Sequence, residues 1–501
     1  MTENLTKSLS GKVKEAGLHT VIYGLGSVLQ AVLGFLLIPL YTKYYTPDIY
    51  GVLALLTICA TLGGSVFYLG ASSALARSYY DYEEGLERKK TISTSLFITL
   101  AGAGIQLLLG ITLRNEISIA LFQTTDYAPH VAIILSSSAF SFTNNLFYLI
   151  LRFERKSKQV ISLNVLSLVL SASLIIVFLT RLHMGVMAPI LGEFLNQVLL
   201  LVILFSLTRK SFTADFSSEE LGIQLRFGIP ALFAGLGYYL LSWSDRFFIN
   251  QYCTLHEVGI YSLGYKFGAM IHIFLIIPFS QIWAPMRMEY RNDSDAREFF
   301  RLILTYYFMA GILFTVSVSL FAKEILSLMS GRPDYIVAYQ VVPIIMIGHL
   351  MYGTINIIDY GIYFSRKIIY HTFIFWLGVI VNMGLNYVFI PQFGYMAAAY
   401  NALFTFCLIV FLVYAVSQKL YPIPLDKRRL AVLFATGATV LAGNQLGQPG
   451  NAIADALLRS LSIAAMVGIM YLLVFDRREK DVIEEFVGVQ KSRLWKLLKT
   501  S

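Results

Sequence analysis

Residues 243–268, WSDRFFINQYCTLHEVGIYSLGYKFG, join two apolar segments that are each long enough to cross a lipid bilayer. The charged residues Asp245, Arg246 and Lys266 lie within these two segments. A charge at the centre of a membrane helix costs about 2.5–3.5 kcal/mol on insertion scales, so it is tolerated where it faces protein or a wet cavity. The stretch therefore predicts a helical membrane bundle with charged residues turned inward.

The composition of the whole chain supports a membrane protein. Of its 501 residues, 57% are hydrophobic and 14% are charged, whereas a soluble globular chain is about 25% charged. The net charge of +9 fits cytoplasmic loops that lie against anionic lipid headgroups better than it fits nucleic acid binding. We therefore expect an all-α, polytopic integral membrane protein with membrane lipids as partners and no nucleic acid.

The hydropathy pattern predicts about fourteen transmembrane helices, since a spanning helix needs about 20 mostly apolar residues. The predicted spans cover about residues 18–40, 51–75, 92–113, 129–151, 160–180, 185–207, 227–248, 258–283, 300–321, 336–358, 368–390, 394–416, 430–447 and 455–475. With both termini cytoplasmic, the inner segments hold more than four times as many of the 39 Lys and Arg residues as the outer segments do. This bias agrees with the positive-inside rule and supports the span count.

An internal repeat divides the chain. YYTPDIYGVLAL at 44–55 aligns with YCTLHEVGIYSL at 252–263, an offset of 208 that matches Gly51 with Gly259. The offset equals six predicted spans, an even number, so the two halves are parallel repeats related by an axis along the membrane normal. Chains of this kind bind substrate between the halves and rock one against the other. The expected units are an N-lobe at 1–208, a cytoplasmic linker at 209–226, a C-lobe at 227–416, a helix pair at 427–475 and a tail at 476–501.

Motifs for covalent chemistry are not found. The sequence has no GxxxxGK[ST] loop for ATP, no HExxH or GxSxG motif, and no CxxC pair among its three cysteines. The predicted outer loops are short, and their acidic residues stand alone. We therefore expect a transporter rather than an enzyme, with no metal and no cofactor.

Lys266 is the strongest candidate for substrate binding, because it lies too deep in its span for its ammonium to reach the surface easily. One interpretation is that it faces a central cavity and binds an anion, and the other is that it forms a buried salt bridge with Asp245. The two are compatible, since Asp245 could hold Lys266 while no substrate is bound. Arg246 is either a further cavity residue or an anchor at the outer interface. The offset of 208 matches Lys266 with Ile58 and Asp245 with Leu37, so only one half has these charges. A cavity between the halves would then have one cationic side, suited to an anionic headgroup.

Other charged or titratable residues are less certain candidates for substrate binding or ion coupling. Arg77 marks either a cytoplasmic mouth or the end of a helix, and Lys43 has the same two interpretations at the outer side. Four residues within or near predicted spans are candidates for ion or proton coupling, or for hydrogen bonds within the bundle: Glu193, His272, His349 and Asp359. The tail has apolar residues spaced as on an amphipathic helix at the inner leaflet, although a solvated tail fits nearly as well.

SDRFFINQYCTLHEVGIYSLGYKFG resembles the helix 7–8 segment of the polysaccharide-biosynthesis flippases, the O-antigen and capsule exporters of the multidrug/oligosaccharidyl-lipid/polysaccharide exporter superfamily. GSVLQAVLGFLLIPLYTKYYTPDIYGVLAL, residues 26–55, resembles the opening of the same family. The resemblance implies two six-helix lobes and a central cavity that receives the diphosphate and sugars of a polyprenyl-diphosphate-linked oligosaccharide. It assigns the diphosphate to Lys266, and it implies that the last two helices shape a groove for the polyprenyl tail.

The function implied is a flippase of the bacterial inner membrane that works by alternating access and has other polysaccharide-assembly proteins as partners. The alternative is a cation-coupled exporter of drugs or small solutes on the same scaffold. A membrane glycosyltransferase or polymerase is disfavoured by the short outer loops. Substrate chemistry separates the first two, because a flippase should ignore hydrophobic cations and a drug exporter should ignore lipid-linked sugars.

Overall fold

The computed structural model describes residues 34–290, 295–446, 452–477 and 479–481, and these are almost entirely helical. The first half consists of α2 (Ile38–Tyr44), α3 (Pro47–Phe67), α4 (Ala71–Ser78), α5 (Leu86–Thr112), α6 (Arg114–Phe122), α7 (Ala128–Phe153), α8 (Ser157–Thr180), α9 (Met187–Thr208) and η1 (Arg209–Ser211). The second half consists of α10 (Ser218–Tyr252), α11 (Leu255–Gly268), η2 (His272–Ile276), α12 (Ile277–Glu289), α13 (Ala296–Leu320), α14 (Ala322–Met329), η4 (Pro333–Gln340), α15 (Val341–Ile358), α16 (Tyr360–Phe364), α17 (Ile369–Phe393) and α18 (Tyr395–Leu420). Two further helices follow, α19 (Lys427–Leu446) and α20 (Ala452–Leu473).

Twelve helical segments of the described residues are long and apolar enough to cross a membrane, which confirms the polytopic membrane class. The first predicted span, about 18–40, lies largely outside the described residues. The thirteenth is present as α19, but its first turn is Lys427, Arg428 and Arg429, and it is not apolar enough to be among the twelve. The tail from residue 482 onward also lies outside the described residues.

The start of α10 differs from the expected one. α10 begins at Ser218 rather than near 227, because Ser217 caps it: the Ser217 hydroxyl accepts a hydrogen bond from the Glu220 backbone N–H at 3.2 Å. Much of the expected linker 209–226 is therefore helical. The turn after α10 ends in a capping box, in which Thr254 and Glu257 satisfy each other's backbone N–H groups and start α11.

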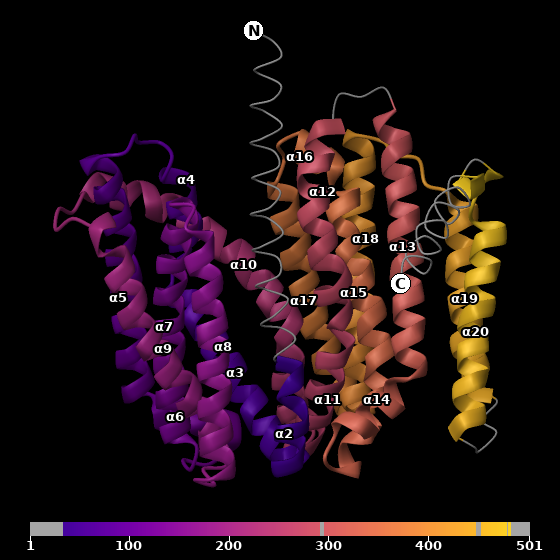
Figure 1. The fold of residues 1–501 in the computed structure, drawn as a ribbon, viewed down its shortest axis with the longest axis horizontal. Coiled ribbons are helices and arrows are strands. Elements are labelled where there is room, and N and C mark those ends of the chain that lie inside the picture. The colour runs from indigo at the N-terminus through magenta and orange to yellow at the C-terminus, as the bar shows by residue number, and fades with distance from the viewer. Residues whose placement is uncertain (1–33, 291–294, 447–451, 478, 482–501) are drawn as a thin grey trace, which may run out of the picture.

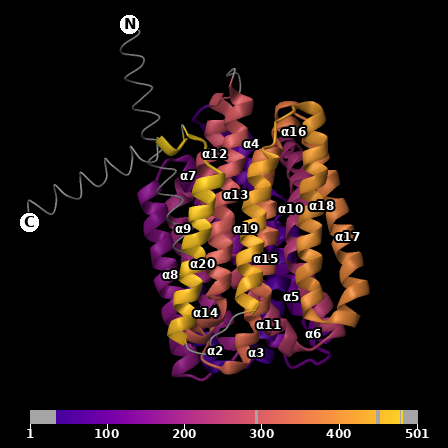
Figure 2. The same ribbon diagram turned by 90° about the vertical axis from the view of Figure 1, so that its right-hand side faces the viewer.

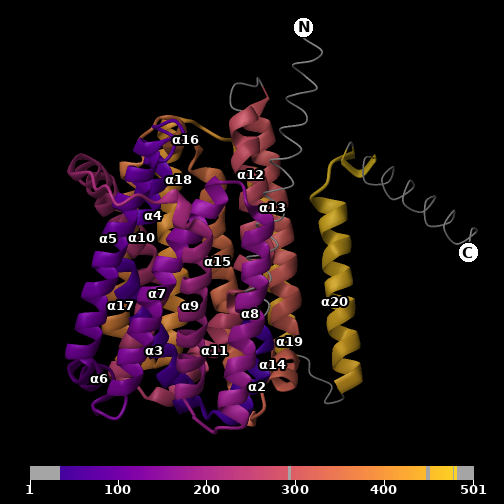
Figure 3. The same cartoon turned by 60° about the vertical axis from the view of Figure 1, so that its left-hand side comes forward.

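The two halves form two lobes that lie side by side. Figure 1 shows the N-lobe in indigo to magenta and the C-lobe in salmon to orange, with α10 crossing from one to the other. α2, α3 and α11 lie together at the lower end of this view, which is the outer end in the predicted orientation. Figure 2 shows α19 and α20, in yellow, on the outside of the C-lobe, and Figure 3 shows α20 from another side. α13 contacts both helices.

The repeat inferred from the sequence is present as a symmetric contact between α3 and α11. A Cβ added at Gly51 would lie 2.2 Å from the Leu255 carbonyl oxygen, and one added at Gly259 would lie 1.9 Å from the Pro47 carbonyl oxygen. An offset of 208 exchanges these two contacts. His256 Nδ1 and Asp48 Oδ2, 3.3 Å apart, are themselves separated by 208 residues. A pseudo-two-fold axis therefore passes through this crossing and relates the two lobes.

Hydrogen bonds between the lobes surround the same outer end. The Tyr335 hydroxyl donates to the Tyr45 carbonyl at 3.2 Å, and the Gly331 N–H donates to the Thr42 hydroxyl at 3.0 Å. Asn250 Nδ2 donates to the carbonyl of Leu121 at 2.6 Å. The lobes are thus held together at the outer end by backbone contact and by hydrogen bonds.

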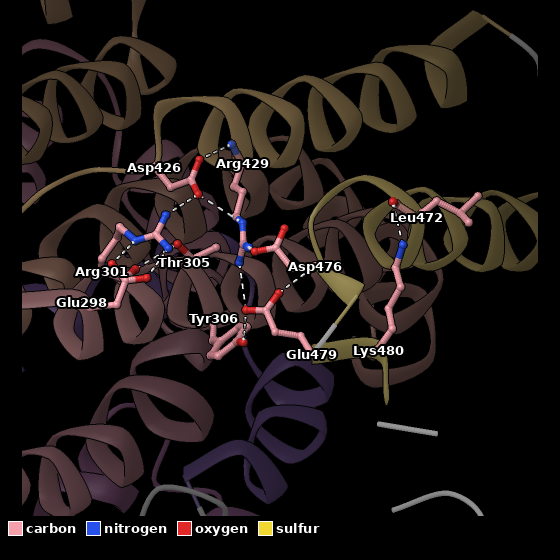
Figure 4. Close-up of polar contacts among 10 residues, drawn as sticks. All are labelled: Glu298, Arg301, Thr305, Tyr306, Asp426, Arg429, Leu472, Asp476, Glu479 and Lys480. Carbon is pink, nitrogen blue, oxygen red and sulfur yellow. Dashed lines mark hydrogen bonds and ion pairs between the residues drawn. The ribbon is translucent and has the colours of Figure 1, made fainter. Parts of the chain in front are cut away.

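Ionic contacts fix the C-terminal helix pair to α13 (Figure 4). Arg429, which is only 5% exposed, pairs with Glu479 at 2.9 Å, with Asp426 at 3.1 Å and with Asp476. Asp426 also accepts from Arg301 of α13 at 2.7 Å. Burial raises the pKa of Glu479, but hydrogen bonds from Tyr306 and Arg429 outweigh this effect and leave the pKa below its usual value. The pair is therefore anchored to the C-lobe at the end that the predicted orientation places in the cytoplasm.

We predict that Gly51→Ala and Gly259→Ala each weaken the closed outer end, because overpacking costs roughly 1–3 kcal/mol. Each variant should lower the thermal unfolding midpoint of the purified protein. It should also raise the labelling of a cysteine placed at the outer end of the central cavity. The matched control is Gly104→Ala in α5, where an added Cβ meets no atom within 4 Å. Equal behaviour of all three variants would contradict a tight α3–α11 contact.

Candidate functional site

A central cavity of about 720 Å³ lies between the lobes. α3, α7 and α9 of the N-lobe and α10 and α11 of the C-lobe contribute most of its lining. Its volume is in the range of pockets that bind small molecules and cofactors. The cavity lies between the halves, where the repeat predicted a substrate site.

The N-lobe side of the cavity is largely apolar, and several small polar groups lie among the apolar side chains. Ser137, Ser141 and Asn145 follow one another at intervals of four residues on α7, so they share one face of the helix. Glu193 of α9 lies on the same side, where it accepts hydrogen bonds from Ser171 at 2.8 Å and from Gln197 at 2.6 Å. The spacing of the α7 residues is visible in the sequence, but polar residues of this size cost little in a membrane helix and were not singled out.

The C-lobe side of the cavity is cationic. Arg246 from α10 and Lys266 from α11 both line it, next to Trp243 and Tyr265. The structure thus brings together two cations that the sequence separates by twenty positions. The sequence predicted a cationic side with Lys266 as its deep charge, and in the structure Arg246 contributes a second positive charge to it.

Arg246 is held rigidly and is not an anchor at the outer interface. Its side chain is only 5% exposed. The guanidinium carbon lies 3.9 Å from the ring centroid of Tyr265 and 5.1 Å from that of Tyr261. Nη1 donates to the carbonyl of Ser242 at 2.5 Å. Stacking on two aromatic faces stabilises the charge by cation–π interaction and fixes its direction.

Lys266 does not pair with Asp245 in the described residues. Its Nζ donates instead to the Gly34 carbonyl of the N-lobe at 2.9 Å. An ammonium has three donor hydrogens, and this bond uses one of them. Lys266 therefore forms a contact between the lobes and can still donate to an anion in the cavity.

Asp245 faces away from the cavity, into a buried cluster of the C-lobe. It is fully buried and accepts hydrogen bonds from the Tyr261 hydroxyl at 2.6 Å and from Asn386 Nδ2 at 2.9 Å. Asn386 Oδ1 in turn accepts from Asn401 at 3.0 Å, and Asn386 also donates to Asn382 at 3.1 Å. The amides of this cluster were not predicted, although Asn382 and Asn386 are one helical turn apart in the sequence.

The four coupling candidates lie in three separate places. Glu193 lines the central cavity. His272 and His349 lie together inside the C-lobe, with ring centroids 5.8 Å apart, and His349 is only 2% exposed. Asp359 lies at the end opposite to the α3–α11 crossing, 3.3 Å from Arg287 Nη1 and 3.5 Å from His371 Nε2. Of the four, only Glu193 therefore lines the central cavity.

The remaining candidates are exposed. Arg77 of α4 stacks on the Phe227 ring at 5.1 Å, in the N-terminal part of α10. Lys43 of α2 lies at the outer end, where its Cα is 2.6 Å from the position of a Cβ added at Gly331. Neither residue lines the central cavity. Among the described residues, no group of three or more His, Cys, Asp and Glu side chains is placed to hold a metal ion.

Comparisons with known proteins agree with this architecture. A sequence profile of the polysaccharide biosynthesis proteins matches residues 18–291. A comparison with curated proteins finds no match. The structure is similar to that of the lipid II flippase MurJ in an inward closed conformation, with a TM-score of 0.72 and 15% identity over 90% of this chain and 99% of that one.

Drug transporters have the same fold. An inward-facing multidrug resistance MATE family transporter of the MOP superfamily gives a TM-score of 0.61 and 14% identity over 81% of this chain and 96% of that one. A MATE transporter in the straight conformation gives a TM-score of 0.56 and 16% identity over 83% of this chain and 95% of that one. At these identities the likeness shows a common fold, so the residues of the cavity must decide between substrates.

We predict that Lys266→Ala and Arg246→Ala each lower transport roughly tenfold or more, since a charge-assisted hydrogen bond contributes about 1.5–3 kcal/mol. Lys266→Arg should keep more activity than Lys266→Ala, because it keeps the charge. Transport should be measured together with protein abundance in the membrane. Lys323→Ala, at an exposed position of α14, is the matched control. A loss of abundance equal to the loss of transport would make these residues structural.

Proposed function

Because the chain belongs to the polysaccharide biosynthesis protein family, we propose that it is a flippase for a polyprenyl-diphosphate-linked oligosaccharide. It moves this lipid from the inner to the outer leaflet of the bacterial inner membrane, for the synthesis of O-antigen or capsule. The observation that supports this most is the cationic side of the central cavity, formed by Arg246 and Lys266. Other polysaccharide-assembly proteins are expected partners.

The two sides of the cavity suit the two parts of such a headgroup. A diphosphate is a strong hydrogen-bond acceptor, and Arg and Lys bind phosphate oxygens through short, charge-assisted bonds. Arg246, fixed by its aromatic neighbours, presents donors in one direction, whereas Lys266 can turn toward an anion. Sugars carry many hydroxyls, and the Ser and Asn side chains of α7 can exchange hydrogen bonds with them.

Binding of the headgroup would also change the contact between the lobes. Lys266 Nζ now donates to the Gly34 carbonyl, across the space between the lobes. A diphosphate is a stronger acceptor than a backbone carbonyl, so it would draw the ammonium into the cavity. A ligand shifts a conformational equilibrium only through a difference in its interactions with the two states. The loss of this inter-lobe bond is one such difference and would favour rocking of the lobes.

Glu193 is the best-placed candidate for ion coupling, because it lines the cavity. His272 and His349 lie within the C-lobe, behind the cavity residue Tyr265, and Asp359 is paired with Arg287. Coupling through Glu193 would make transport depend on the protonation or ion occupancy of a carboxylate that faces the substrate.

The alternative is a cation-coupled exporter of drugs or small solutes, which the common fold with MATE transporters keeps open. Two cations on one side of the cavity disfavour it, since like charges across a binding interface are repulsive. A membrane glycosyltransferase or polymerase is disfavoured because no carboxylate pair for acid–base catalysis faces the cavity in the described residues.

Cells that lack this protein test the proposal. We predict that a polyprenyl-diphosphate oligosaccharide accumulates in them and is protected from glycosidases added to the outer face of the membrane. Wild-type protein should reverse the accumulation, and Lys266→Ala should not. Normal lipid-linked sugars together with greater sensitivity to toxic hydrophobic cations would favour the exporter instead.

A further inference from the structure

A second cavity lies between the lobes, and it is apolar. It has a volume of about 450 Å³. α3, α5, α6 and α7 form its N-lobe side, and α10 and α17 form its C-lobe side. Leucine, phenylalanine and methionine side chains dominate the lining, including Leu109, Leu240 and Met383. Several of these face outward, with Phe247 at 48% and Met383 at 38% exposure, so the cavity borders the lipid side of the molecule.

The amide of Gln106 and the hydroxyl of Ser244, which line this cavity, are already hydrogen-bonded. Gln106 Nε2 donates to the Leu135 carbonyl at 3.1 Å and to Ser138. The Ser244 hydroxyl donates to Asn382 Oδ1 at 3.3 Å. Neither group needs a partner in the cavity, so the space suits a ligand without hydrogen-bonding groups. A hydrocarbon chain has that chemistry.

The apolar cavity adjoins the central cavity, because Ile58 and Trp243 line both. The internal repeat allows the residues at this junction to be compared with those of the other lobe. Ile58 of α3 occupies the position that corresponds to Lys266 of α11, so equivalent positions contribute a cation to the central cavity and an apolar side chain to the junction. A ligand that filled both cavities would be anionic and polar at one end and a long hydrocarbon at the other.

We propose that the apolar cavity receives the polyprenyl chain of the molecule whose diphosphate binds Arg246 and Lys266. This inference rests on the proposed function and adds the place of the tail. It differs from a groove at α19 and α20, since no described residue of those two helices lines this cavity. The chain would leave the headgroup past Ile58 and Trp243 and lie between α5 and α17.

The apolar cavity would determine where the polyprenyl tail lies, and it would add little to the free energy of binding. Within a bilayer, a tail that moves from lipid into an apolar cavity gains packing contacts but little hydrophobic free energy. Because the sides belong to different lobes, a chain between them stays next to the headgroup while the lobes move. The tail would therefore cross the membrane along the seam between the lobes.

Site-specific photocrosslinking tests the proposal on the full-length protein in lipid nanodiscs. A benzophenone amino acid is placed at Leu109 or Met383, and the probe is a labelled long-chain polyprenyl diphosphate. The matched controls are Leu108 and Ile380 on the same helices, which are 62% and 66% exposed and do not line the cavity. A further control is Leu461 of α20, which is 66% exposed.

We expect about fivefold more crosslinking at Leu109 and Met383 than at the three controls, the ratio given by a preference of about 1 kcal/mol. Unlabelled polyprenyl diphosphate should compete for these sites, and phospholipid should not. Leu109→Trp and Met383→Trp should slow transport, whereas Leu108→Trp and Ile380→Trp should not.

A crosslinker at Thr57, which lines the central cavity, distinguishes failure of the tail site from failure of the proposed function. Crosslinking at Thr57 with only control-level labelling at Leu109 and Met383 overturns the tail site and leaves the flippase intact. No crosslinking at Thr57 overturns the proposed function and the tail site together. Equal competition by phospholipid would identify the occupant as bulk membrane lipid and overturn the tail site, and labelling strongest at Leu461 would place the tail at α20 instead.

Discussion

The backbone contact between α3 and α11 is the constraint on which the rest of the structure depends. Two helices can approach so closely only where both lack side chains, and Gly51 and Gly259 provide that at equivalent positions of the repeat. The contact sets the pseudo-two-fold axis, and the axis places the central cavity between equivalent helices. Opening of the outer end would separate this pair and break the hydrogen bonds beside it.

The scaffold is symmetric, but the chemistry within it is not. Arg246 and Lys266 both come from the C-lobe, and the N-lobe contributes hydroxyls, amides and Glu193. A lipid headgroup that joins a diphosphate to sugars has a matching division, with an anionic part and a part rich in hydroxyls. The aromatic rings that hold Arg246 and the Gly34 carbonyl that holds Lys266 replace water as partners for charges within the membrane. Neither charge forms a direct ion pair with a carboxylate among the described residues, which leaves both available to an anionic substrate.

Much of the fold follows from the sequence, because the length of apolar segments, the side preferred by Lys and Arg and the offset of 208 are all properties of the chain itself. The directions of individual side chains do not follow from it. Asp245 and Arg246 are neighbours in the sequence but point to different sides of α10, one into the amide cluster and one into the cavity, as adjacent residues on a helix must. The sequence could not decide whether Asp245 pairs with Lys266, because that contact depends on how two helices are rotated about their axes. Lys266 was nevertheless identified, because a charge at that depth has a cost that the sequence reveals.

The most direct test of the central claim uses the purified protein alone in liposomes that contain a fluorescent polyprenyl-diphosphate oligosaccharide in one leaflet. The measured quantity is the rate at which an added membrane-impermeant quencher or glycosidase gains access to lipid that began in the other leaflet. A flippase should raise this rate well above that of empty liposomes, and the rate should fall in Lys266→Ala. An unchanged rate in wild-type liposomes, with transport of a hydrophobic cation by the same preparation, would contradict the account.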